Sequence, residues 1–179
     1  RLGYNTKDYA VYSNRLYRKE EFRMSIDRSS LVADKHEIET LQRLYAKATD
    51  TIGLASPEKI EEGRAIYHRI YTDDVDISTA NTGAEVELKA VGPDAWVDVV
   101  YGALKDYTGT QHLIGTQLTE VNGDEGCLES YLNAWHKNPD ESVYYFLGTY
   151  ISKVRRYEEG WKIYQMVLRR DTSGIVQMH

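Results

Sequence analysis

One histidine lies in a stretch whose residue types could carry acid–base chemistry. Residues 110–120 alternate as an extended strand does, with His112, Ile114, Thr116 and Leu118 on one face. An imidazole titrates close to neutral pH, so a His112 side chain inside a pocket could take a proton from a substrate. The other interpretation is a core histidine whose ring is hydrogen-bonded to a backbone carbonyl.

Further candidates come from residues that combine an apolar body with a polar tip. Tyr45, Tyr67 and Tyr71 fall on the inward stripes of two predicted helices. They could line a pocket, or they could pack in the core with their hydroxyls reaching its rim. Asn133 and Trp135 share one face of a predicted strand. That face either lines the interior or faces a partner subunit.

The sequence offers poor sites for metals and cofactors. Its five histidines are scattered, and no pair has the spacing of a metal site. No glycine-rich phosphate loop and no serine or cysteine nucleophile motif is present. We therefore expect neither a metal nor another cofactor. His136 stands near a strand end beside Lys137, which favours a solvated side chain.

The composition bounds the class of protein. A chain of 179 residues is the length of one ordinary domain, and 28% charged residues with 41% hydrophobic residues are typical of a water-soluble fold. No apolar run approaches the ~20 residues that span a bilayer. The net charge of −6 argues against nucleic acid as a partner. The single cysteine, Cys127, excludes an internal disulfide and is compatible with a reducing, cytoplasmic compartment.

The hydrophobic pattern predicts an α+β domain. Helices are expected from the capping box of Asp34 and Glu37 to Gly53, from Ser56 to about residue 71, and from Gly92 to about residue 107. A turn at 72–74 and a hairpin of strands 75–78 and 85–89 separate the second helix from the third. Four long strands follow, at about 110–121, 127–136, 143–157 and 161–170. The helices should cover one side of a strongly curved, mostly antiparallel sheet.

The segments outside this pattern suggest a domain of residues 34–171 between an N-terminal arm, 1–33, and a tail, 172–179. The arm is basic and rich in tyrosine, which suits either docking on an acidic surface or a partly ordered terminus. Tyr144, Phe146 and Tyr150 alternate as an exposed outer sheet face would, so we expect a homodimer or homotrimer.

Several short motifs occur in an order that is similar to one family. They are Leu-Tyr-Ala-Lys-Ala-Thr-Asp at 44–50, Tyr-Thr-Asp-Asp at 71–74, Gly-Pro-Asp-Ala-Trp at 92–96, Thr-Gln-His at 110–112, Gly-Thr-Tyr at 148–150 and Gly-Trp-Lys-Ile at 160–163. In this order the chain resembles the SnoaL-like branch of the NTF2-like superfamily, which includes scytalone dehydratase, polyketide cyclases and a dehydrochlorinase. The resemblance implies a cone-shaped α+β barrel.

The same resemblance implies roles for individual residues. It makes His112 a general base oriented by Asp50, with Tyr45 polarising the substrate. The position of Asp50 follows from the resemblance, because on the helical wheel it lies away from the apolar stripe. Tyr67, Tyr71, Asn133 and Trp135 would then contact the substrate.

The implied function is a cofactor-independent lyase or isomerase acting on a small, apolar, cyclic molecule. The family also includes proteins without catalysis and small subunits of ring-hydroxylating oxygenases, so a ligand-binding or assembly module and an oxygenase subunit stay open as alternatives.

Overall fold

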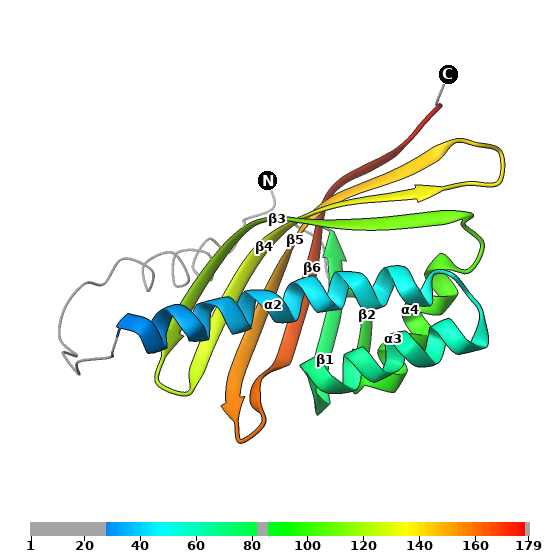
Figure 1. Ribbon diagram of the computed structural model, residues 1–179. Coiled ribbons are helices and arrows are strands. Elements are labelled where there is room, and N and C mark those ends of the chain that lie inside the picture. The colour runs from blue at the N-terminus through cyan, green and yellow to red at the C-terminus, as the bar shows by residue number, and fades with distance from the viewer. Residues whose placement is uncertain (1–27, 82–85, 178–179) are drawn as a thin grey trace.

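The structure, a computed structural model, describes residues 28–81 and 86–177. Residues 1–27 of the predicted arm lie outside this part of the chain. Figure 1 shows the arrangement of the elements. In chain order they are α2 (Arg28–Ile52), α3 (Pro57–Ile70), β1 (Tyr71–Asn81), β2 (Val86–Val91), α4 (Pro93–Leu104), β3 (Gly109–Asn122), β4 (Glu125–Lys137), β5 (Val143–Tyr157) and β6 (Gly160–Val176).

The strands of the described residues form one six-stranded sheet in the order β2-β1-β6-β5-β4-β3. Every neighbouring pair is antiparallel except β1 and β6, which run parallel. The long helix α2 crosses one face of the curved sheet, and α3 and α4 lie near β1 and β2 (Figure 1). The predicted α+β architecture, three helices on a curved and mostly antiparallel sheet, is confirmed, although the sheet does not close on itself.

Two strand predictions were wrong at their ends. Residues 72–74, predicted as a turn, belong to β1, which starts directly after α3. The pairing of β1 with β6 shifts between Tyr71 and Asp76, so the irregularity that suggested a turn is a bulge within the strand. The last strand also continues past residue 170, and its Val176 pairs with Val143 of β5.

The capping box predicted at Asp34 and Glu37 is wrong, because α2 is already helical at Arg28. Both carboxylates instead bind the turn between β5 and β6. Asp34 accepts hydrogen bonds from Arg156 Nη2 at 2.6 Å and from Trp161 Nε1 at 3.2 Å. Glu37 Oε1 accepts the backbone N–H of Trp161 at 2.9 Å. The two carboxylates that suggested an N-terminal cap therefore anchor α2 to β5 and β6 of the sheet.

A bulge in β3 changes which residues face the helices. The register of β3 against β4 gains one residue between Ile114 and Gln117. Past this point the alternation inverts: Leu118 is 63% exposed, whereas Gln117 turns inward and donates to the Glu39 carbonyl at 3.1 Å. The predicted common face of His112 and Leu118 is therefore wrong, since it assumed an uninterrupted strand.

Close contacts hold the C-terminal end of α2 against its neighbours. A Cβ on Gly53 would lie 2.5 Å from Thr110 Cγ2, so the end of the helix touches the start of β3. A Cβ on Gly63 would overlap Ile52 Cγ1, which shows how closely α3 packs on the same turn. Glycine at these two positions lets the last turn of α2, which carries Asp50, reach β3.

No helix in the described ranges is both long enough and apolar enough to cross a membrane.

Candidate active site

His112 and Asp50 form a pair at the contact between β3 and α2. Asp50 Oδ1 lies 2.7 Å from His112 Nδ1, and Asp50 Oδ2 accepts the backbone N–H of His112 at 3.1 Å. The carboxylate thus holds both the ring and its backbone, and it selects the tautomer with the proton on Nδ1. The His112 side chain is only 8% exposed. Its Nε2 is the ring nitrogen left for a substrate.

A second histidine belongs to the same network. His136 Nδ1 lies 2.9 Å from Thr110 Oγ1, and that hydroxyl is 3.5 Å from Asp50 Oδ1. The two histidine rings meet edge to face, with centroids 5.3 Å apart. Burial, followed by the nearby His112, lowers the pKa of His136 to about 4. At neutral pH His136 is therefore an uncharged ring beside His112.

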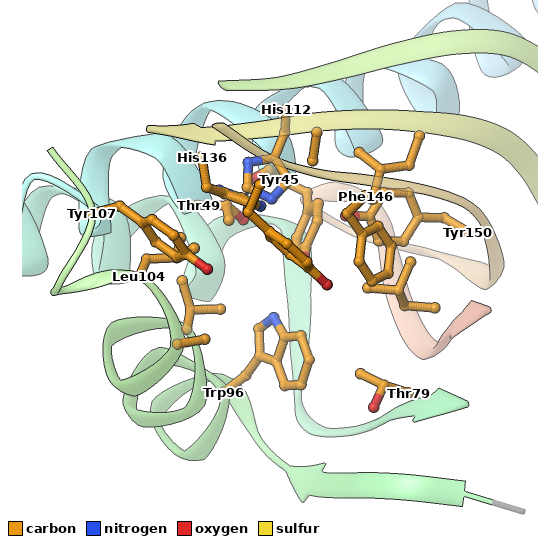
Figure 2. Close-up of a pocket in the computed structure, with 16 residues that line it drawn as sticks. Tyr45, Thr49, Thr79, Trp96, Leu104, Tyr107, His112, His136, Phe146 and Tyr150 are labelled. Atoms are coloured by element: carbon orange, nitrogen blue, oxygen red, sulfur yellow. Dashed lines mark hydrogen bonds between the residues drawn. The ribbon is translucent and has the colours of Figure 1, made fainter. Parts of the chain in front are cut away.

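The two histidines line a cavity of about 250 Å³ between the sheet and the helices, shown in Figure 2. Its other lining residues are mostly aromatic or aliphatic: Tyr45, Thr49, Thr79, Trp96, Val100, Ala103, Leu104, Tyr107, Leu132, Ala134, Tyr144, Phe146, Tyr150 and Leu168. No lysine, arginine, aspartate or glutamate is among them. The cavity therefore suits an apolar molecule with few polar atoms.

The three tyrosines predicted from the helices have different places. Tyr45 lines the cavity, with its ring stacked on that of Tyr67 at 5.7 Å between centroids. Tyr67 and Tyr71 are fully buried outside the cavity lining. The Tyr67 hydroxyl is 2.6 Å from Thr49 Oγ1, and the Tyr71 hydroxyl donates to Met166 Sδ at 3.6 Å. Tyr67 and Tyr71 therefore pack against the Tyr45 ring without lining the cavity themselves.

Asn133 and Trp135, predicted to contact the substrate, lie on the opposite face of the sheet from the cavity. Trp135 is 40% exposed and packs against Tyr145, with centroids 6.1 Å apart. The physical reason is the strand alternation itself, because Leu132, Ala134 and His136 occupy the inner positions of β4. A partner subunit on this outer face, the alternative for these residues, stays a prediction.

The same alternation corrects two further expectations. Tyr144, Phe146 and Tyr150, expected on the outer face, line the cavity. They are paired across the β4–β5 ladder with the inner residues of β4, for example Tyr144 with His136. His136, expected in solvent, is only 5% exposed. Its parity with Leu128 and Leu132 along β4 is the sequence signal that could have placed it inside.

Two buried polar groups in the cavity wall lack a partner. The Trp96 indole N–H and the Tyr150 hydroxyl make no hydrogen bond within the described residues, although their side chains are 3% and 1% exposed. Burial raises the pKa of Tyr45, and the nearby polar groups of Tyr150, Thr49 and Trp96 lower it in part, so these groups lie around the Tyr45 hydroxyl. Polar groups therefore gather at two places, around Tyr45 and around His112.

In the described part of the chain, no three histidine, cysteine, aspartate or glutamate side chains gather into a possible metal site. The acidic and imidazole groups that do meet, Asp50 with the two histidines, are held by one another and by Thr110. Their arrangement is suited to holding and moving a proton.

The family of the chain follows from a match to the SnoaL-like domain over residues 30–167, and the chain belongs to this family. Solved structures share its fold. A proposed scytalone dehydratase from Novosphingobium aromaticivorans is 21% identical, with a TM-score of 0.65 over 83% of this chain and 91% of that one. The hexachlorocyclohexane dehydrochlorinase LinA-type3 from Novosphingobium barchaimii is 14% identical, with a TM-score of 0.63 over 87% of this chain and 99% of that one.

A third similar structure is an NTF2-like protein with a cystatin-like fold from Novosphingobium aromaticivorans. It is 16% identical, with a TM-score of 0.62 over 82% of this chain and 92% of that one. No protein of curated function matches the chain in sequence. These likenesses place the chain in the NTF2-like fold, as its motifs predicted.

Proposed function

We propose that this protein is a lyase that removes a proton from carbon in a small, apolar, cyclic substrate and expels a neighbouring hydroxyl group. The observation that carries the proposal is the His112–Asp50 pair, with Nδ1 and Oδ1 2.7 Å apart at the edge of an aromatic cavity. Names of two similar structures, a dehydratase and a dehydrochlorinase, describe eliminations and agree with it.

His112 acts as the general base in this mechanism. Its Nδ1–H donates to Asp50, so Nε2 carries the lone pair that takes the proton. Asp50 then stabilises the imidazolium, because the negative carboxylate lies against the ring that becomes positive. Little water competes for the base, since the His112 side chain is nearly enclosed.

The electrons and protons of the step balance without a redox partner. The electron pair of the broken carbon–hydrogen bond forms the new carbon–carbon double bond. The carbon–oxygen bond breaks, and its electron pair leaves with the oxygen. The His112 imidazolium returns its proton to that oxygen, which leaves as water. Isomerisation shares the first step and differs only in returning the proton to another carbon.

Polar groups around Tyr45 in the cavity wall would stabilise the charge that develops on the substrate. The Tyr45 hydroxyl is buried among Tyr150, Thr49 and Trp96 and lines the cavity. Hydrogen-bond donors in a dry site stabilise a developing oxyanion far more than they would in water. We assign this role to Tyr45. The existence of an open cavity beside the pair favours catalysis over a purely structural module.

The test is turnover of a panel of cyclic β-hydroxy ketones, followed by the absorbance of the conjugated product. His112→Gln keeps a polar side chain of similar size but lacks the base. We expect its rate to fall by about 10²–10⁴-fold, the usual contribution of a positioned general base. His36→Gln is the matched control, because His36 is an exposed histidine of α2 with no place in the cavity.

Circular dichroism and thermal unfolding of both variants would show that the fold is intact. Equal rates for His112→Gln and the wild-type protein on a substrate that the wild-type protein converts would contradict the mechanism. A panel left unconverted by the wild-type protein, together with tight binding of its members, would favour a binding module instead.

A further inference from the structure

The structure points to the chemical class of the substrate at this site. We propose that it is an uncharged compound of one or two rings whose oxygen acceptor is bound by the Trp96 indole N–H, with the Tyr150 hydroxyl as a second contact. This inference deepens the proposed function and rests on it only for the position of the reacting carbon near His112.

The first argument is the unpaired donor of Trp96. The indole nitrogen is a donor only, its side chain is 3% exposed, and it has no partner within the described residues. A buried donor without a partner destabilises the empty protein, because it has lost its hydration without gaining a hydrogen bond. Figure 2 shows this nitrogen directed from α4 into the cavity. A ligand oxygen seated there would remove the cost.

The second argument is that other hydroxyls converge on the same place. Tyr150 is 1% exposed, and its hydroxyl also lacks a partner in the described ranges. The Tyr45 and Tyr150 rings meet edge to face, with centroids 5.1 Å apart. The hydroxyl of Tyr45 is buried among Trp96 and Tyr150. One acceptor oxygen at this end of the cavity would have several donors within reach.

The third argument concerns charge. The cavity wall holds no lysine or arginine, and its two histidines are hydrogen-bonded to Asp50 and to Thr110. An anionic ligand would lose its hydration without gaining a cation, and Asp50 would repel it from behind His112. Because no carboxylate lines the wall either, a cationic ligand lacks a counter-charge. An uncharged carbonyl compound is the class that fits.

The fourth argument concerns size. The cavity measures about 250 Å³. An apolar cavity of about 150 Å³ accommodates a benzene molecule. The present one therefore has room for a substituted ring or for two fused rings, but not for a long chain or a nucleotide.

The experiment compares two probes of the same ring shape by isothermal titration calorimetry. The neutral ketone 2-tetralone carries the acceptor oxygen, and the hydrocarbon tetralin lacks it. We expect the wild-type protein to bind 2-tetralone about tenfold more tightly than tetralin, the range of one or two neutral hydrogen bonds. Trp96→Phe should reduce this ratio to about twofold or less while tetralin still binds.

Tyr150→Phe provides a second variant that removes a single hydroxyl and keeps the ring, in case Trp96→Phe fails to fold. It should reduce the ratio by a smaller factor, about threefold. The anion 2-naphthoate should bind more weakly than 2-tetralone. An equal affinity of the wild-type protein for both tetralin and 2-tetralone, an unchanged ratio in folded Trp96→Phe, or tighter binding of 2-naphthoate would each overturn the inference.

The same titrations separate this inference from the proposed reaction. In His112→Gln the preference for the ketone should persist and should still be lost on adding Trp96→Phe. If the ketone preference depended on Trp96 in this way but the wild-type protein converted none of the cyclic β-hydroxy ketones, the lyase proposal would fail and the ligand class would stand. If turnover depended on His112 while Trp96→Phe left the ratio unchanged, the reaction would stand and the ligand class would fail.

Discussion

Two aspartates of α2, Asp34 and Asp50, make the same kind of contact and have different consequences. Each holds a ring nitrogen with one oxygen and a second donor with the other. Asp34 binds Trp161 Nε1 and the guanidinium of Arg156, and Asp50 binds Nδ1 and the backbone N–H of His112. The bond type alone does not distinguish a structural carboxylate from one proposed to orient a base.

The difference lies in the partners and in what surrounds them. At Asp34 the partner ring is an indole, which does not titrate, and Arg156 lies over it with its Cζ 4.5 Å from the ring centroid. That cluster is closed and its charges are paired. At Asp50 the partner is the imidazole of His112, which titrates. This ring lines a cavity, and its Nε2 is not bound by Asp50. A carboxylate can serve a reaction only where the group that it orients is still able to bind something else, and of these two aspartates only Asp50 meets that condition.

In the comparison of the two aspartates, the largest effect is expected from Asp50→Asn. An amide in this place can donate to Nδ1, which would turn the ring to the wrong tautomer, and it cannot stabilise an imidazolium. We expect the rate on any substrate that the wild-type protein converts to fall by about 10²–10³-fold, with little change in substrate binding. Steady-state kinetics checks this through kcat and KM separately.

Asp34→Asn is the matched control for that experiment, since it makes the same chemical change on the same helix. Its kcat per folded molecule should stay within about twofold of the wild-type value. A large loss of kcat in Asp34→Asn, or none in Asp50→Asn, would show that the distinction between the two ends of the helix is wrong.

A second prediction uses pH, because only the Asp50 end contains a buried neutral histidine. The pKa of His136 is about 4 in the folded protein, below the usual value of 6.5. Between these pH values the unfolded chain binds a proton that the folded protein does not, so stability is full above pH 6.5 and decreases as the pH falls toward 4. The decrease attributable to His136 is about 3 kcal/mol.

Urea unfolding at a series of pH values, compared between wild-type protein and His136→Phe, isolates this contribution. Phenylalanine keeps a ring between Tyr107 and Tyr144 but does not titrate. The difference in unfolding free energy between the two proteins should therefore change across this window. A constant difference from pH 7 to pH 4 would mean that His136 is not held neutral by the fold.

The third prediction concerns the stability of the Asp34 end. In Asp34→Asn one oxygen can still accept from Trp161, but the negative charge that faces Arg156 is gone. Arg156 keeps its contact with Asp124 at 3.2 Å, which limits the cost. We expect a loss of about 1–2 kcal/mol in urea unfolding at pH 7. Asp50→Asn, whose partners are bound at the edge of a cavity, should lose less.

The sequence predicted much of this architecture because its signals were local. Periodicity and turn residues such as Asn122 and Gly123 placed the long strands, and the order of short motifs indicated the family. Two of the errors, in β1 and in β3, share one cause. A bulge in β1 resembled a turn, and one in β3 reversed the faces of the strand, because a bulge is defined by pairing with another strand.

Within the candidate site, only the residues whose roles the family resemblance implied could be predicted together. His112 and Asp50 pair, and His112 and Tyr45 line one cavity, while the roles that the resemblance implies for them stay predictions. The wheel of α2 gave no reason to direct Asp50 toward β3. Asp50 reaches His112 because β3 lies against the end of the helix at Gly53, a tertiary contact. The unpaired indole N–H of Trp96 could not be foreseen from the sequence, since it depends on the space that several separate elements leave unfilled.

The smallest expected effect belongs to Glu37, and it tests whether the Asp34 end depends on charge or on hydrogen bonding. Glu37 Oε1 accepts the backbone N–H of Trp161 and lies against Gly160, whose φ of 115° suits glycine. Glu37→Gln keeps an acceptor oxygen, so its unfolding free energy should stay within about 0.5 kcal/mol of the wild-type value. Glu37→Ala removes the acceptor and should cost about 1 kcal/mol. Equal losses in both variants would mean that the turn is held by the charge, and the Asp34 end would then be electrostatic throughout.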